Sequence, residues 1–117
     1  MTGALSRAQG VGRAGEDLAA AWYETHGYEV VARNWRCELG EIDLVCVKGR
    51  LLVVCEVKAR SSSVYGLPAE AVGRSKQLRL RRLSGRYVAE SGRRASTVRF
   101  DVASVLSGEI DVITAAF

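Results

Sequence analysis

The feature that most constrains this chain is a pair of apolar runs separated by only two residues. Residues 40–48 and 51–58 are rich in valine and leucine, and Gly49-Arg50 stands between them. β-Branched residues favour strands, and glycine readily adopts the positive φ of a tight hairpin turn. We therefore predict an antiparallel hairpin in which Lys48 faces Leu51, so that the numbers of paired positions add up to 99.

The rest of the chain alternates between helical and extended patterns. The remaining expected elements are a helix over 12–26 that stops at Gly27, a strand over 28–35, a loop over 59–67, a helix from Pro68 to about Ser91, and strands over 97–105 and 109–113. The order αβββαβ, with one more short strand, predicts an α/β fold with a central mixed sheet flanked by helices. At 117 residues the chain suits one core, so we expect a single domain over 1–117.

The second expected helix has an apolar stripe with one gap. Its members recur at helical spacing and are Ala69, Val72, Leu80, Leu83 and Tyr87. Lys76 fills the gap in this stripe. We therefore expect Lys76 to face inward, while Arg74, Arg81 and Arg82 project elsewhere.

The expected hairpin brings two acids and a lysine to one patch. Its register places Asp43 opposite Glu56 and Glu41 opposite Lys58, and opposed residues point to the same side with Cβ atoms roughly 5 Å apart. Glu56 and Lys58 are two residues apart, so they share a face of the sheet. Asp43, Glu56 and Lys58 are therefore the candidate catalytic residues. The alternative is a cross-strand ion pair with a purely structural role.

A divalent cation would resolve the repulsion between these two acids. Glu56 lies in an apolar strand, and two carboxylates in a low-dielectric setting repel each other unless a cation is present. Oxygen-only ligands suit Mg²⁺ or Mn²⁺, which can activate a water for phosphodiester hydrolysis. Glu16, beside the small residues Ala19 and Ala20, is a candidate third ligand; the alternative is a solvent-facing helix acid.

Basic residues are concentrated in the second half of the chain. The net charge is +4, and residues 74–94 contain eight basic residues and one acid. Such a field attracts polyanions, DNA above all, although a solvated helix face is the alternative. Arg60, Arg74 and Arg81 are candidate nucleic-acid-binding residues. Neither a membrane-spanning run nor an apolar leader is present, so we expect a cytoplasmic protein with no membrane partner.

The spacing of Asp43 and Glu56-Val57-Lys58 resembles the Asp…Glu-Xaa-Lys signature of the restriction-endonuclease-like, or PD-(D/E)XK, superfamily. Further motifs resemble the YraN-type family of small predicted bacterial endonucleases over nearly the whole chain. These motifs are Gly15-Glu16, Arg33-Asn34, 40–44, 56–60, Lys76-Gln77, 99–102 and Ala116-Phe117. The sequence departs from the superfamily pattern at Ile42, where proline often precedes the aspartate.

The resemblance implies a restriction-endonuclease-like αβββαβ core, similar to that of archaeal Holliday-junction resolvases. It implies that Asp43 and Glu56 bind the metal, that Lys58 is the catalytic lysine, and that Glu16 adds an acid. It also implies that Lys76 and Gln77 approach the scissile phosphate.

We therefore expect a metal-dependent endonuclease that cuts branched or otherwise structured DNA in repair or recombination, and a two-fold symmetric junction as substrate would favour a homodimer. The alternatives are a nucleic-acid-binding module that cuts nothing and a protein-binding scaffold on a nuclease fold.

Overall fold

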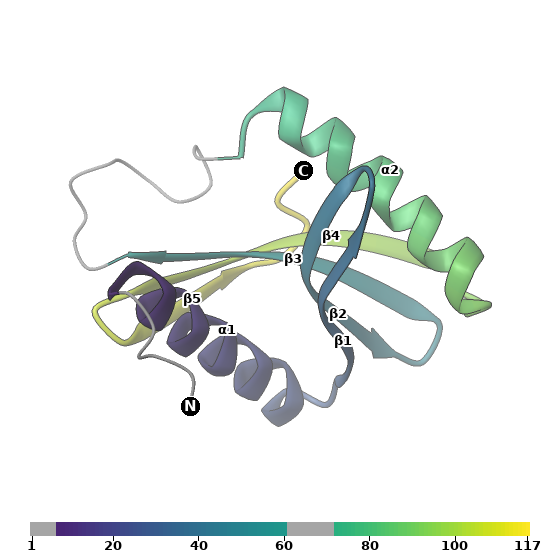
Figure 1. The fold of residues 1–117 in the computed structure, drawn as a ribbon. Coiled ribbons are helices and arrows are strands. Elements are labelled where there is room, and N and C mark those ends of the chain that lie inside the picture. Colours follow the sequence, from purple (N-terminus) through teal and green to yellow (C-terminus); the bar gives the residue numbers. More distant parts are fainter. Residues whose placement is uncertain (1–6, 61–71) are drawn as a thin grey trace, which may run out of the picture.

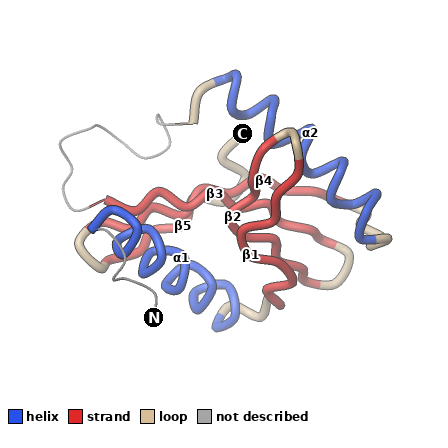
Figure 2. Tube along the Cα trace, in the orientation of Figure 1, coloured by secondary structure: helices blue, strands red, loops and turns tan. Residues whose placement is uncertain are grey.

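A computed structural model describes residues 7–60 and 72–117 of the protein, with side chains from residue 12 onward. Within these residues the chain forms two helices and five strands (Figures 1 and 2). They are α1 (Arg7–Thr25), β1 (Glu29–Cys37), β2 (Gly40–Lys48), β3 (Leu51–Arg60), α2 (Arg74–Ser91), β4 (Thr97–Leu106) and β5 (Glu109–Ile113). The predicted order αβββαβ, followed by one short strand, is confirmed.

The strands form a single mixed sheet in the order β1-β2-β3-β4-β5. β3 and β4 pair in parallel, and the other neighbouring strands pair antiparallel. A parallel pair needs a long crossover connection, and α2 lies in the one between β3 and β4. The α/β class with a central mixed sheet is therefore confirmed.

The two helices cover opposite faces of the sheet (Figure 1). On the α1 face, Ala19 and Tyr23 pack against strand residues such as Cys55. On the α2 face, Leu83 packs against a second set that includes Val54. Because neighbouring strand residues point to opposite faces, Val54 and Cys55 belong to different cores. Glu56 therefore shares the α2 face with Val54.

Gly15 allows α1 to lie close to β3. A Cβ atom at position 15 would stand 2.6 Å from the Cβ of Ala59, a separation that side-chain carbons do not adopt. The absence of a side chain at Gly15 thus sets the depth at which the next residue, Glu16, meets the sheet edge.

The predicted hairpin register is confirmed. Lys48 pairs with Leu51, and the pairing continues to Leu44 and Cys55, so that paired numbers add up to 99. Gly49 has a φ of +59°, as the tight turn requires. The register therefore brings Asp43 and Glu56 to the point where the paired part of the hairpin ends.

Both helices begin at other residues than predicted. α1 starts at Arg7 rather than Gly12, because residues 7–11 contain no proline that would stop it. α2 ends at Ser91 as predicted but starts at Arg74. The expected continuous helix from Pro68 is wrong, because Gly73 is extended, with φ −71° and ψ 169°, and caps α2. Pro68 and Ala69 themselves lie outside the described residues.

Neither described helix is both long and apolar enough to cross a lipid bilayer. The three cysteines form no disulfide, and Cys46 and Cys55 are buried.

Candidate active site

The candidate site lies where β2 and β3 separate. The hairpin register would place Val57 opposite Ile42, but the backbone N–H of Val57 donates to Oδ2 of Asp43 at 2.8 Å. A side-chain carboxylate therefore takes the place of a backbone partner. Next to Asp43 in the sheet, Asn34 of β1 has a φ of +52°, and neither residue is part of the β1–β2 register. Figure 1 shows the β1–β2 hairpin bending away toward α2 at this end.

Asp43 and Glu56 form a close pair of carboxylates. Glu56 is only 7% exposed although it carries a carboxylate. Burial, and next the charge of Glu56, raise the pKa of Asp43 from its ordinary 3.8 to about 8, while the Val57 hydrogen bond acts in the opposite direction. The pair therefore holds a proton at neutral pH when no added cation balances it.

Two lysines complete the centre. Nζ of Lys76, on α2, lies 3.1 Å from Oε1 of Glu56. Burial acts against the charged form of Lys76, but the charge and hydrogen bond of Glu56 raise its pKa. Burial, and next the hydrogen bond and charge of Lys76, lower the pKa of Lys58. The inward direction of Lys76 was predicted from its place in the apolar stripe, and it is confirmed.

Glu16 lies near this pair but has other partners. Its Oε2 accepts a hydrogen bond from Nδ2 of Asn34 at 3.0 Å, and its Oε1 lies 3.8 Å from Arg33. Its charge still contributes to the raised pKa of Asp43. Within residues 7–60 and 72–117, no three acid, histidine or cysteine side chains converge on one metal position. Asp43 and Glu56 are thus a pair, with Glu16 close by.

The expected opposition of Glu41 and Lys58 is wrong. Glu41 pairs with Arg36 in the β1–β2 register, and its carboxylate accepts hydrogen bonds from Nε of Arg36 and from Nδ2 of Asn34. β2 pairs with β3 only from Leu44 to Lys48, so the alternation that holds near the turn does not extend back to position 41. Lys58 instead lies near Asp43, Glu56 and Lys76.

The candidate nucleic-acid-binding residues lie at several places. Gln77 donates from Nε2 to the carbonyl of Val72 at 3.0 Å, so its amide braces the start of α2. Arg74 is exposed in the first turn of α2, and Arg60 is half-buried at the end of β3. Arg81 is exposed, and its guanidinium carbon lies 4.7 Å from the ring centroid of Phe100. Lys76 contacts the carboxylate pair directly, through Glu56.

Asn34 is the site residue to which sequence reasoning assigned no role. Its amide reaches both Glu16 and Glu41, at 3.0 and 3.4 Å, and so connects α1 with β2 beside Asp43. Asparagine tolerates the left-handed backbone conformation better than most residues. An asparagine inside a β-rich run was the available signal for a bend at this position.

The donors at this centre fit a hard divalent cation. Asp43 and Glu56 offer carboxylate oxygens, and they are close enough for one to raise the pKa of the other. Carboxylate oxygens suit Mg²⁺ or Mn²⁺ better than they suit softer metals. A bound cation would remove the repulsion that makes the pair retain a proton.

The fold and site define a small mixed α/β protein with a carboxylate pair, in which Glu56 is buried and Asp43 half-buried, and two adjacent lysines. A sequence profile described as "Uncharacterised protein family UPF0102" matches residues 15–105. The chain therefore belongs to the UPF0102 family. The match includes every residue of the carboxylate–lysine centre.

Relatives of this family occur in several bacteria, and each is named as a UPF0102 protein. One from Beutenbergia cavernae is 53% identical over 96 residues, which are 82% of this chain and 81% of the relative. One from Rhodococcus jostii is 49% identical over 98 residues, 84% of this chain and 83% of the relative. One from Moorella thermoacetica is 46% identical over 94 residues, 80% and 78% of the two chains.

Proposed function

We propose that the protein is a metal-dependent endonuclease that hydrolyses phosphodiester bonds of DNA, with branched or otherwise structured DNA as its substrate in repair or recombination. The observation that carries this proposal is the pairing of Asp43 with the buried Glu56, beside Lys58 and Lys76. Two carboxylates in a largely buried place repel each other and destabilise a fold unless a proton or a cation balances their charge.

Asp43 and Glu56 are the residues that would hold the metal, and Glu16 is the candidate for a third ligand. A bound Mg²⁺ or Mn²⁺ supplies an activated water and neutralises charge on the phosphate. To join this shell, the Glu16 carboxylate would have to leave the amide of Asn34, to which it is hydrogen-bonded at 3.0 Å.

The two lysines give the site its positive side. Because burial and Lys76 weaken its hold on a proton, the Lys58 amine can orient an attacking water or donate to a phosphate oxygen. The ammonium of Lys76 forms an ion pair with Glu56. A phosphate that entered between α2 and β3 would form an ion pair with this ammonium in place of Glu56. Both roles agree with the resemblance of Glu56-Val57-Lys58 to the superfamily signature.

The small size of the protein favours recognition of DNA structure over sequence. Specific duplex readers place an element in a groove and bury about 1,000–2,500 Å² of protein surface. Here the exposed basic side chains along α2 suit phosphate contacts, which position a substrate but carry no sequence information. A distorted or branched backbone is therefore the feature that such a protein can select.

A second candidate function is a nucleic-acid-binding module that does not cut. The Lys76–Glu56 ion pair favours it, because an ammonium 3.1 Å from the carboxylate supplies a counter-charge without any metal. In that case the basic face of α2 is the functional surface, and the carboxylate pair only anchors Lys76.

A cleavage assay separates the two functions. Purified protein is incubated with junction, flap and single-stranded DNA in Mg²⁺ or Mn²⁺, beside Asp43→Asn and Glu56→Gln. Matched controls are Asp111→Asn and Glu109→Gln, which change exposed acids of β5. The endonuclease predicts cleavage that both site variants abolish and both controls retain. Binding without cleavage, equal in all five proteins, would instead support the module.

A further inference from the structure

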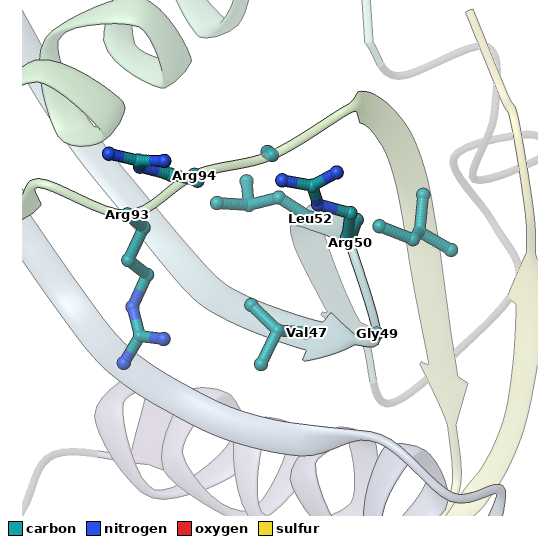
Figure 3. A pocket seen from close by; sticks show the side chains of 8 residues that line it. Val47, Gly49, Arg50, Leu52, Arg93 and Arg94 are labelled. Carbon is teal, nitrogen blue, oxygen red and sulfur yellow. The ribbon is translucent and has the colours of Figure 1, made fainter.

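A hollow ringed by arginines lies at the opposite end of the β2–β3 hairpin from the carboxylate pair. It has a volume of about 140 Å³ and is formed where the hairpin turn meets the segment between α2 and β4. Figure 3 shows the side chains of Arg50, Arg93 and Arg94 around it, with Val47 and Leu52 between them. None of the residues that line the hollow is acidic.

The three guanidinium groups have no counter-charge within the described part of the chain. No ion pair or side-chain hydrogen bond involves them there. Glu29 lies opposite Val47 in the β1–β2 register, but it forms no ion pair with any of the three. Three like charges around one hollow repel one another, so an anion that enters it is stabilised.

The backbone holds the three arginines together. Gly92 ends α2 with a φ of +70°, which turns the chain so that Arg93 and Arg94 lead toward β4. The N–H of Ser96 then donates to the carbonyl of Arg50 at 2.9 Å. This bond fixes the segment after α2 to the hairpin turn, so the ring is a built feature of the fold.

We propose that this hollow binds a backbone phosphate of the same nucleic acid whose cleavage is proposed above, as a second contact remote from the carboxylate pair. Arginine forks match phosphate oxygens two at a time, and the hollow greatly exceeds the roughly 15 Å³ that one water needs. The inference rests on the proposed function only for its substrate class, because phosphate binding here requires no cleavage.

The separation of the two sites favours a polymer over a small phosphate compound. Arg50 lies in the turn directly before β3, and Glu56 of β3 lies six residues further along the chain, which corresponds to roughly 20 Å of extended chain. That length spans about six nucleotides along one strand of a duplex. Exposed Arg74, Arg79 and Arg82 lie on α2, which leads from Lys76 at the carboxylate pair to Arg93 at the hollow. A nucleic acid lying along α2 therefore meets these basic side chains between the carboxylate pair and the hollow, although Arg86, further along the helix, is paired with Glu38 and Glu90.

The test is DNA binding without divalent metal, so that catalysis plays no part. A labelled duplex of about 20 base pairs is titrated in EDTA between about 50 and 200 mM salt, with fluorescence anisotropy as the readout. The variants are Arg50→Gln, Arg93→Gln, Arg94→Gln and their triple combination. Arg13→Gln, which changes an exposed arginine of α1, is the matched control.

One lost phosphate contact lowers the slope of log affinity against log salt by about 0.9. The DNA affinity of the variant then falls about 3- to 4-fold less than that of the wild type over this salt range. We expect this reduction and weaker binding for the triple variant, partial weakening for the single variants, and no change for Arg13→Gln. The single variants, each of an exposed side chain, keep the test valid if the triple variant unfolds.

A wild-type slope and affinity in the triple variant, or in the single variants where these alone fold, would overturn the proposal. So would loss of binding only to inorganic phosphate or to phosphatidylserine vesicles, with DNA binding unchanged. Failure of the cleavage assay with a reduced slope in EDTA would refute the nuclease and leave the phosphate contact standing. Normal cleavage with an unchanged slope would support the nuclease and refute the phosphate contact.

Discussion

Replacing Asp43 by asparagine should make the protein more stable in the absence of divalent metal, and increasingly so as the pH rises. The substitution removes one charge of the carboxylate pair but keeps a side-chain oxygen that can accept the hydrogen bond from the N–H of Val57. It therefore tests the repulsion between Asp43 and Glu56 with little change in shape.

The direction follows from the raised pKa. The carboxyl of Asp43 holds its proton up to about pH 8 in the folded chain, whereas an unfolded aspartate loses it near 3.8. Between these values the folded chain binds more protons than the unfolded chain, so its stability falls as the pH rises. The stabilising effect is complete below the unfolded pKa and is lost as the pH passes through the folded one.

The magnitude follows from the same window. Each pH unit over which the folded and unfolded chains differ by one proton changes the free energy of unfolding by about 1.4 kcal/mol. From about pH 5 to 8 the wild type should lose up to roughly 4 kcal/mol relative to Asp43→Asn. Because the charge of Glu56 is one of the causes that raise the pKa of Asp43, Glu56→Gln should show the same trend.

The assay is urea unfolding in EDTA at about pH 5, 6, 7 and 8, with the free energy of unfolding extrapolated to zero denaturant. Asp111→Asn, which changes an exposed aspartate of β5, should follow the wild type at every pH. The reasoning is refuted if Asp43→Asn and the wild type lose stability in parallel over this range. That result would mean that the two carboxylates do not share a confined place.

Three further predictions concern metal binding and packing. Mn²⁺ at about 100 times its dissociation constant should stabilise the wild type by about 2.7 kcal/mol, seen as a rise in the thermal unfolding midpoint, and should leave Glu56→Gln nearly unchanged. Gly15→Ala should cost about 1–3 kcal/mol in urea unfolding, because the new Cβ would lie 2.6 Å from that of Ala59. Tyr23→Phe should cost about 1–3 kcal/mol in the same assay, because its hydroxyl donates to the fully buried Asp101 at 2.7 Å.

The glycine prediction has a matched control in the same helix. A Cβ atom at Gly12 meets nothing within 4 Å, so Gly12→Ala should stabilise the protein by about 0.5–1 kcal/mol through better helix propensity. Equal effects at positions 12 and 15 would contradict the close approach of α1 to β3. For Tyr23, an unchanged stability would mean that its hydroxyl is not needed by Asp101.

The part of the fold that local chemistry determines was predictable. A two-residue turn leaves one register for the strands that flank it, so Gly49-Arg50 alone predicts that Lys48 faces Leu51, as the structure has it. The helical spacing of α2 likewise indicated that Lys76 faces inward, and it contacts Glu56.

The bend of the sheet was not predictable from the same rules. It depends on the positive φ of Asn34 and on the use of the Asp43 carboxylate as a backbone partner for Val57. Both features depend on contacts between different strands, and the period-2 alternation of side chains along one strand does not predict them. The error in the partner of Glu41 follows directly from this bend.

The arginine ring was not predictable from the sequence either, because the parallel pairing of β3 with β4 brings Arg50 close to Arg93 and Arg94. The start of α2 was misplaced for a simpler reason. The apolar stripe extends back to Val72 and Ala69, but Gly73 is extended and caps the helix, so that α2 begins only at Arg74.

The most direct measurement of the central claim is a crystal structure of the protein soaked with Mn²⁺, with anomalous scattering used to locate the ion. We predict one strong peak bound by carboxylate oxygens of both Asp43 and Glu56, with Nζ of Lys76 displaced from its 3.1 Å contact with Glu56. The absence of a peak between these carboxylates at saturating Mn²⁺, with the Lys76–Glu56 ion pair intact, would contradict the account.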